Sequence, residues 1–158
     1  KQKTAYEIPL RLVGSEMCNK RQVAGMGFSN VGLGIDHAMA HTLSAHYDTP
    51  HGVACAMLLP IAMEFNKPVC AERLAKVAVA MGVDTTGMST DEAADAAIAA
   101  VKQLSADVNI PHVCEAMKAD EIEVLAKDAM ADACFPGNPR EATLDDVIEL
   151  FKKICPAA

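Results

Sequence analysis

Hydrophobic residues recur every three or four positions through most of the chain, which is the spacing of one face of an α-helix. The pattern is clearest in residues 90–107 and 144–154. Alternating apolar and polar residues, which would indicate strands, are scarce, as are runs of β-branched and aromatic residues. The pattern therefore predicts an all-α domain.

The ends of several predicted helices carry recognisable capping residues. Ser89 and Glu92 have the spacing of a capping box, Thr143 is a favourable N-cap, and Gly82 is a favourable residue just after a helix. The predicted helices span residues 15–28, 31–46, 51–65, 68–81, 90–107, 120–134 and 144–154.

The segment 51–65 is the most apolar of these helices and carries little polar surface. We therefore expect it to lie at the centre of the fold. Pro60 should kink it, because proline lacks the backbone N–H that continues the helix. Asn66 and Lys67 are expected to end this helix, and Pro68 to open a separate one.

Composition agrees with one helical domain over residues 1–158. Only 4% of the residues are aromatic and Trp is absent, so Ala and Met must fill much of the core. Both residues favour helices, and Met fills irregular gaps between them.

Charge and cysteine content narrow the class of protein. The net charge of −7 argues against nucleic acid as a partner. No uninterrupted apolar run approaches the roughly 18 residues of a membrane span, so we expect no membrane insertion. The six cysteines lie far apart without a C-x-x-C pair, which favours reduced thiols and a cytoplasmic location.

A glycine-rich stretch at residues 25–34 could suggest a dinucleotide-binding turn. Its spacing is G-x-G, four residues, G-x-G, which differs from the G-x-G-x-x-G fingerprint, and no strand precedes it. We reject a Rossmann turn here. The glycines are instead expected to let helices or a ligand approach the backbone closely.

Four of the five histidines lie in residues 34–54, and three of them can converge. His37 and His41 are four residues apart and share a helix face. His51 follows the turn at 48–50 and can fold back against that face. Because neutral imidazoles are common metal ligands, the sequence predicts a metal site here.

The remaining histidines are not expected to take part. His46 should point away from His37 and His41, and His112 should lie at the surface. Spacing alone nominates His37 and His41 as ligands, as in the H-E-x-x-H motif. The Glu of that motif is absent, so a zinc protease is disfavoured.

The stretch GIDHAMAHTLSAHYDTPHGVA, together with AGMGFSNVGLG and GNPREAT, closely resembles the iron-containing (group III) alcohol dehydrogenases. Within them it is similar to the lactaldehyde reductase and 1,3-propanediol dehydrogenase type. The resemblance runs from about Glu16 to Phe151. It implies the helical C-terminal domain of these enzymes and of the wider dehydroquinate synthase-like group.

The resemblance also implies roles for individual residues. In that family Fe(II), and sometimes zinc, is held by one Asp and three His, of which His37 and His51 would be two. His41 would be the catalytic histidine near the metal and nicotinamide, used in proton transfer or coenzyme contact. This differs from the assignment by spacing, and we follow the resemblance. Residues implied to line the substrate and coenzyme pocket are Phe28, Leu33 and Cys134.

The implied activity is NAD(P)-linked oxidation of small alcohols or reduction of aldehydes. The family's dinucleotide-binding N-terminal domain, its Asp ligand and its first His ligand have no counterpart in this sequence. We therefore expect this chain to be inactive alone and to require that N-terminal domain as a partner, in an enzyme that is a homo-oligomer. The alternative is a non-catalytic helical module for interaction or dimerisation.

Overall fold

The computed structural model describes residues 22–23, 25–27 and 32–156. The helix predicted at 15–28 therefore lies mostly outside the described residues, although those described within it are helical. Contacts divide the chain into two units, Lys1–Leu33 and Gly34–Ala158. The fold described below is that of the second unit.

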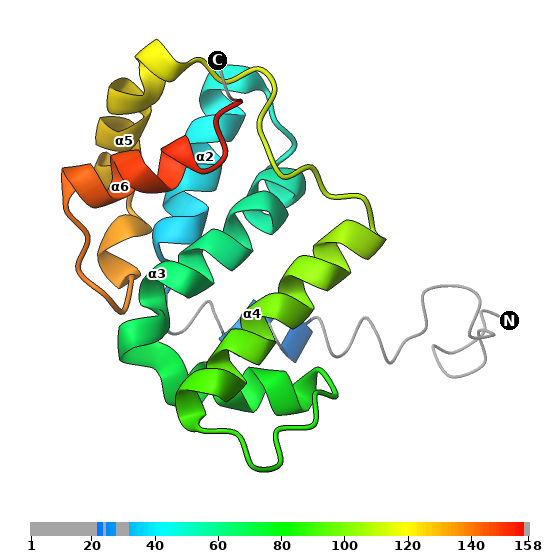
Figure 1. Cartoon of the computed structure of the whole chain (residues 1–158). Coiled ribbons are helices and arrows are strands. Elements are labelled where there is room, and N and C mark those ends of the chain that lie inside the picture. The colour runs from blue at the N-terminus through cyan, green and yellow to red at the C-terminus, as the bar shows by residue number, and fades with distance from the viewer. Residues whose placement is uncertain (1–21, 24, 28–31, 157–158) are drawn as a thin grey trace, which may run out of the picture. The chain divides into compact units, whose positions relative to one another are not determined.

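The second unit is built from helices, and the described part of the chain contains no strand, so the predicted all-α class is confirmed. Figure 1 shows their order. The elements are α2 (Ile35–Tyr47), α3 (His51–Ala80), α4 (Thr90–Asp107), the 3₁₀ turn η1 (Ala119–Glu121), α5 (Ile122–Ala131), the 3₁₀ turn η2 (Phe135–Gly137) and α6 (Leu144–Lys152).

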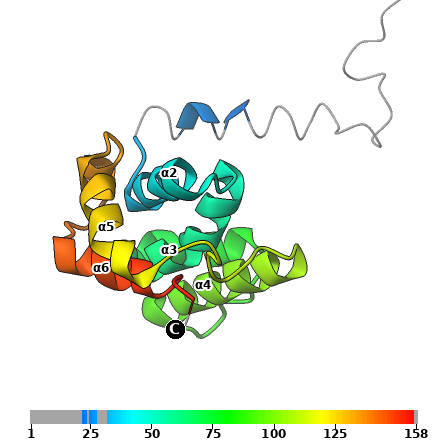
Figure 2. The same ribbon diagram turned by 90° about the horizontal axis from the view of Figure 1, so that it is seen from above.

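Helix α3 lies in the middle, with α5 and α6 on one side and α4 on the other (Figures 1 and 2). Its first half contributes Met57, Leu58 and Phe65 to the main core, as expected for a central helix. Side chains of α2, α5 and α6 complete that core. Its largest fully buried side chains are Phe151, Ile35, Met39, Leu43, Leu58, Leu125, Ile154 and Val147.

The prediction of separate helices at 51–65 and 68–81 is wrong, because α3 continues through Pro60 and Pro68. Figure 1 shows the ribbon of α3 changing direction along its length. An interior proline removes one helical hydrogen bond and crowds the carbonyl four residues earlier, so it can bend a helix without ending it. Packing on both sides of the bend compensates for that cost.

The second half of α3 belongs to a smaller core of its own. Leu74 and Ala78 pack there with Ala94, Ala97 and Ile98 of α4. Alanine at these positions allows two helices to approach closely, which accounts for the alanine-rich sequence of α4. The fold therefore has two hydrophobic clusters joined by one bent helix.

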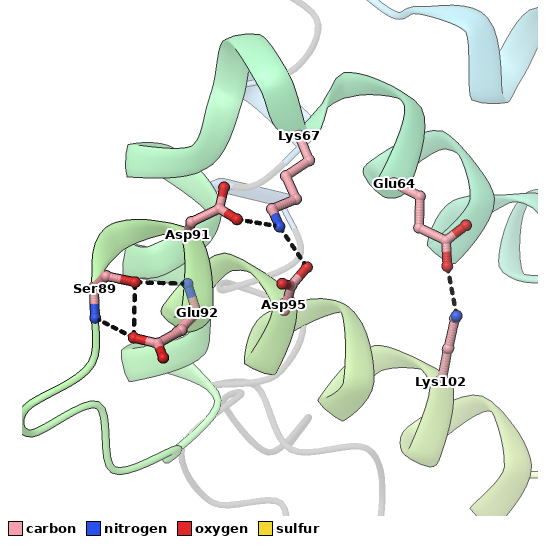
Figure 3. A network of polar contacts seen from close by, with 7 residues as sticks. All are labelled: Glu64, Lys67, Ser89, Asp91, Glu92, Asp95 and Lys102. Carbon is pink, nitrogen blue, oxygen red and sulfur yellow. Dashed lines mark hydrogen bonds and ion pairs between the residues drawn. The ribbon is translucent and has the colours of Figure 1, made fainter.

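Ion pairs join α3 to α4 across this contact (Figure 3). The Lys67 ammonium lies 2.7 Å from carboxylates of both Asp91 and Asp95, and Lys102 lies 2.5 Å from Glu64. At least one partner of each pair is well exposed to solvent, which screens the charges, so these pairs contribute little to stability.

Some apolar residues that follow the three- to four-residue spacing are exposed. Leu104 of α4 and Val108 just after it are 54% and 59% exposed, and Val77 of α3 and Met81 just after it are each 37% exposed. Helical periodicity therefore does not by itself show which apolar residues are buried.

The length and hydrophobicity of helix α3 bear on the expectation that no segment inserts into a membrane. Helix α3 is long and apolar enough to cross a bilayer by length and composition alone. The core helix of a soluble protein passes the same test, and 39% of the relevant window is buried inside the protein. A single helix of this kind is weak evidence for a membrane span.

The capping predictions are confirmed in atomic detail. Ser89 and Glu92 form a reciprocal capping box, and Thr143 forms a second one with Asp146. Gly82 adopts a φ of 84°, while the N–H of Val83 donates to the carbonyl of Ala78 at 3.0 Å. This is a Schellman motif, in which glycine tolerates the left-handed conformation.

The GNPREAT segment, residues 137–143, packs against the start of α2 and against α3. Asn138 Oδ1 accepts from the backbone N–H of Ile35 at 3.3 Å and from Asn66 Nδ2 at 3.0 Å. Arg140 donates to the carbonyl of Phe65 at 2.7 Å, and its guanidinium lies 4.1 Å from the centre of the Phe65 ring. These two residues therefore fasten the segment to α2 and α3.

The close approach of Asn138 also explains one of the glycines. A Cβ at Gly34 would lie 2.9 Å from Asn138 Oδ1 and 3.2 Å from its Cα. The expected close approach is thus confirmed at Gly34. At Gly27 and Gly32 a Cβ would meet no atom of the described residues within 4 Å, and the φ of 84° at Gly32 favours glycine there.

We expect Asn138→Ala to lower the free energy of unfolding by about 1–3 kcal/mol, because it leaves partly buried polar groups without partners. Urea denaturation measures the loss. Asn66→Ala and the double variant complete a cycle, and the double loss should be smaller than the sum of the single losses because the amides bond each other. Additive losses would show that the two amides act independently.

Candidate functional site

The turn between α2 and α3 brings three histidines together. Asp48 ends α2 in the left-handed conformation, with a φ of 51°, and α3 begins at His51. The ring of His51 lies 5.4 Å from that of His37 and 5.1 Å from that of His41, centre to centre. The predicted convergence of the three imidazoles is therefore present in the fold.

His37 is held in a state suited to binding a cation. Burial lowers its pKa below the ordinary value for histidine, and the nearby imidazoles of His51 and His41 lower it further. Its ring is therefore neutral at physiological pH, with a nitrogen lone pair available. A neutral imidazole is the form that ligates metals.

Asp36 stands directly beside this imidazole. Its Oδ2 lies 3.4 Å from His37 Nδ1, and its Oδ1 is buried without a hydrogen-bond partner among the described residues. Burial raises the pKa of the Asp36 carboxyl to about 7. With Nδ1 facing Asp36, Nε2 is the nitrogen of His37 that remains free to bind a ligand.

His41 is engaged differently from His37. Its Nδ1 lies 2.9 Å from Oδ2 of Asp132, just beyond the end of α5. Burial opposes the charge on Asp132, yet hydrogen bonds from the backbone N–H of Cys134 and from His41 hold the pKa of that carboxyl below its usual value. The ionised carboxylate can only accept, so His41 Nδ1 carries a proton, and Nε2 is the acceptor in the neutral form of the ring.

Cys55 lies one helical turn beyond His51 on the same face of α3. Its Sγ is 3.5 Å from His51 Nε2 and 3.9 Å from His51 Nδ1. Burial raises the pKa of this thiol to about 11. In the absence of a cation, Cys55 is therefore a neutral thiol at physiological pH.

Two groups of side chains in the described part of the chain have the geometry to hold a metal ion. His37, His51 and Cys55 form one group, and His41, Asp132 and Cys134 form the other. Within each group the ligand atoms all lie within 4.8 Å of one another. The chemistry of the first donor set, two imidazoles and one sulfur, fits a transition metal.

The other sequence-predicted residues have varied positions. Cys134 lies with His41 and Asp132, whereas Phe28 is outside the described residues. Leu33 is partly buried and belongs to the first unit. His46 pairs with Asp128 at 2.8 Å, and His112 is exposed, so both lie outside the three-histidine cluster as expected.

The five described cysteines, at positions 55, 70, 114, 134 and 155, are free thiols, as predicted for reduced cysteines. Cys18 lies outside the described residues.

Sequence reasoning missed three neighbours of the histidines. Cys55 could have been found, because its four-residue spacing from His51 places both on one helix face. Asp36 adjoins His37, but only tertiary packing shows that its carboxyl is buried. Asp132 is 91 residues from His41, and no local spacing signals that contact.

The sequence of this chain matches that of a known protein family. Residues 5–155 match the model of the Fe-containing alcohol dehydrogenase family, C-terminal. The chain is 51% identical over 140 residues to lactaldehyde reductase from Escherichia coli (strain K12), covering 87% of this chain and 37% of that protein. It is 41% identical over 133 residues to 1,3-propanediol dehydrogenase from Citrobacter freundii, covering 83% of this chain and 34% of that protein.

A solved structure of the same family has a similar fold. The alcohol dehydrogenase from Oenococcus oeni superposes with a TM-score of 0.81 at 44% identity, over 90% of this chain and 36% of that one. The chain thus spans roughly a third of the length of the relatives it matches. With the histidine-bearing helices arranged as described, it belongs to the Fe-containing alcohol dehydrogenase family, as a counterpart of that family's C-terminal helical domain.

Proposed function

We propose that this chain is the metal-binding, helical part of an NAD(P)-linked alcohol dehydrogenase or aldehyde reductase that acts on small alcohols or diols. The observation that carries the proposal is the cluster of His37, His41 and His51, whose ring centres lie 5.1–6.1 Å apart. Similarity to lactaldehyde reductase and 1,3-propanediol dehydrogenase supports the substrate class.

In this proposal His37 and His51 hold Fe(II) or zinc. The distance between ring centres does not favour His37, since the ring of His51 lies 5.4 Å from His37 and 5.1 Å from His41. The ligand atoms of His37 and His51 belong to one candidate metal-binding group, whereas His41 belongs to the other group, with Asp132. Asp36 orients His37 by facing its Nδ1. When bound, the metal supplies a Lewis acid that stabilises negative charge on the substrate oxygen.

His41 acts in this proposal as the group that accepts or returns the hydroxyl proton. Asp132 holds the proton on Nδ1 and leaves Nε2 as the proton acceptor. The carboxylate also stabilises the imidazolium that forms when Nε2 takes up a proton. Phe28, Leu33 and Cys134 would line the substrate and coenzyme pocket.

The remaining components would come from a coenzyme-binding N-terminal domain of the family's kind. NAD(P) carries the hydride, and protein groups orient it against the substrate carbon. The described residues supply the histidines but no Gly-rich phosphate-binding loop. The 158-residue chain by itself should therefore neither oxidise propanediol nor reduce lactaldehyde.

The ligand assignment is tested by metal binding to the purified 158-residue chain. His37→Ala and His51→Ala should each weaken zinc binding at least about tenfold, a ratio that calorimetry or competition with a chelator measures, because each removes a direct ligand.

The matched control is His46→Ala, a histidine of the same helix α2 that pairs with Asp128 outside the cluster. It should leave zinc affinity unchanged. Unaltered affinity in both His37→Ala and His51→Ala would disprove the ligand assignment.

A further inference from the structure

We propose that Asn138 is a positioning residue for His37. It caps the start of α2 from a distant part of the chain and so holds the helical turn on which His37 stands. The inference rests on the proposed function, in which His37 holds the metal. It deepens that function by adding a residue that lies outside the histidine cluster.

The first turn of α2 has no cap from its own segment. The N-cap position is occupied by Gly34, which has no side chain to accept a hydrogen bond. The first hydrogen bond inside the helix runs from the N–H of Ala38 to the carbonyl of Gly34 at 3.2 Å. The N–H groups of residues 35–37 therefore have no acceptor within the helix, and a helix end of this kind frays unless another group bonds those donors.

Asn138 supplies an acceptor for one of these donors. Its Oδ1 accepts from the N–H of Ile35 at 3.3 Å, across 103 residues of sequence. Asparagine is a favoured N-cap because its side-chain oxygen bonds a first-turn N–H, and here the same chemistry comes from another segment. His37 is the third residue of α2, so it stands on the turn that this bond holds.

The amide of Asn138 is fully used in this position. Its Oδ1 also accepts from Asn66 Nδ2 at 3.0 Å, while its Nδ2 donates to Asn66 Oδ1 at 2.9 Å and to the carbonyl of Arg140 at 2.6 Å. Two donors and two acceptor positions are all that a primary amide has. Because Asn66 belongs to α3, the cap sets the start of α2 relative to the helix that carries His51.

The backbone of Gly34 packs closely against Asn138, so the contact can be disturbed from either side. A Cβ at Gly34 would lie 2.9 Å from Asn138 Oδ1 and 3.2 Å from its Cα. The φ of −136° at Gly34 is one that alanine adopts readily. Gly34→Ala therefore pushes the cap away without removing a polar group.

His41 does not depend on this cap in the same way. It lies one turn further along α2, and its Nδ1 is 2.9 Å from Asp132 Oδ2. Opening of the first turn moves His37 and leaves His41 bonded to Asp132. The cap therefore acts on one histidine assigned to the metal rather than on the whole cluster.

Hydrogen exchange of the zinc-free 158-residue chain tests the cap directly. In Asn138→Ala the amide of Ala38 should exchange about fivefold faster, the factor by which loss of a typical cap shifts a local opening equilibrium. The amide of Leu43, further along α2 and fully buried, should keep its rate. Gly34→Ala should give the same pattern, because it displaces the same acceptor.

Zinc affinity, measured by competition with a chelator, tests whether the cap acts through His37. Asn138→Ala should weaken zinc binding about two- to fivefold, because a frayed first turn lowers the population of the binding-competent state. The same substitution in a His37→Ala background should change the affinity no further, since the residue that the cap positions is already gone. A merely structural effect would give the same factor in both backgrounds.

Ser89→Ala is the matched control. It removes the N-cap and capping box of a different helix, α4, which packs in the smaller hydrophobic cluster. It should lower folding stability, as urea denaturation measures, yet leave the exchange rate of Ala38 and the zinc affinity unchanged.

Four outcomes overturn the role of Asn138. They are an unchanged Ala38 exchange rate in Asn138→Ala, an equal rise in Ser89→Ala, an equal loss of zinc affinity with and without His37, and an unchanged affinity in Asn138→Ala when His37→Ala weakens it. The ligand assignment is tested separately by His37→Ala alone. If that variant keeps the wild-type affinity, the proposed function fails, and the exchange of Ala38 decides the positioning of His37: a local rise supports it and no rise overturns it.

Discussion

Replacing His41 with alanine is expected to slow turnover by about 10²–10⁴-fold in an enzyme that joins this chain to a coenzyme-binding domain, while metal content stays near that of the wild type. The resemblance to the family gives His41 a role in proton transfer, and Asp132, 2.9 Å from its Nδ1, leaves Nε2 able to accept a proton. Steady-state kinetics and elemental analysis of the purified variants measure the two quantities.

His46→Ala is the matched control for this experiment. His46 is also on α2 and also pairs with a carboxylate, Asp128, at 2.8 Å, but it lies outside the cluster. It should retain the wild-type rate. Asp132→Asn should lower the rate and alter its pH dependence, because the amide no longer fixes the His41 tautomer. If His41→Ala loses its metal as completely as His51→Ala does, then His41 is a ligand instead.

The second large expected effect is a pH-dependent loss of folding stability caused by the buried Asp36 carboxyl. In the metal-free chain, we expect Asp36→Asn to raise the free energy of unfolding at pH 8 by on the order of 4 kcal/mol relative to its effect at pH 4. Burial raises the pKa of this carboxyl from 3.8 to about 7, so ionising it inside the fold is costly. The neutral amide removes that cost.

The sign follows from proton binding in the two states. Between pH 4 and 7 the folded protein retains the Asp36 proton while the unfolded chain has released it. Stability supplied by the protonated carboxyl is therefore complete below pH 4, falls as pH rises, and is lost above pH 7. Urea denaturation of wild type and variant across this range, with chelator present, gives the difference curve.

Asp146→Asn provides a control of the opposite sign. Hydrogen bonds from the backbone and side chain of Thr143 hold the pKa of Asp146 below its usual value. Its contribution is present above pH 4 and is lost as pH falls further, so its difference curve should be flat between pH 4 and 8. A flat curve for Asp36→Asn over the same range would show that the Asp36 carboxyl is ionised and compensated in the folded state.

Local sequence determined most of the helices and how they end. The Ser89 capping box, the Gly82 Schellman motif and the Thr143 cap depend on residues within one or two turns of each other, so their chemistry is visible in the sequence. The turn before His51 is local in the same sense. It brought His37 and His51 together as the spacing predicted.

Helix-ending residues in the sequence predicted the wrong helix boundary where tertiary packing stabilises a longer helix. Asn66 and Pro68 predicted a helix end, yet α3 runs to Ala80 because its two halves are packed in two separate hydrophobic clusters. The hydrogen bond from Arg140 to the carbonyl of Phe65 further supports the chain near the bend. Such compensation comes from residues distant in sequence.

The distinction between the histidines also required tertiary structure. By spacing, His37 and His41 are equivalent members of one helix face, and sequence alone nominated them as a ligand pair. In the fold, His41 is bound by Asp132 from 91 residues away, whereas His37 faces the buried Asp36 and shares a donor set with His51 and Cys55. The sequence thus determined which imidazoles converge, and burial and long-range contacts decided which nitrogen of each remains free, because both depend on neighbours that only folding supplies.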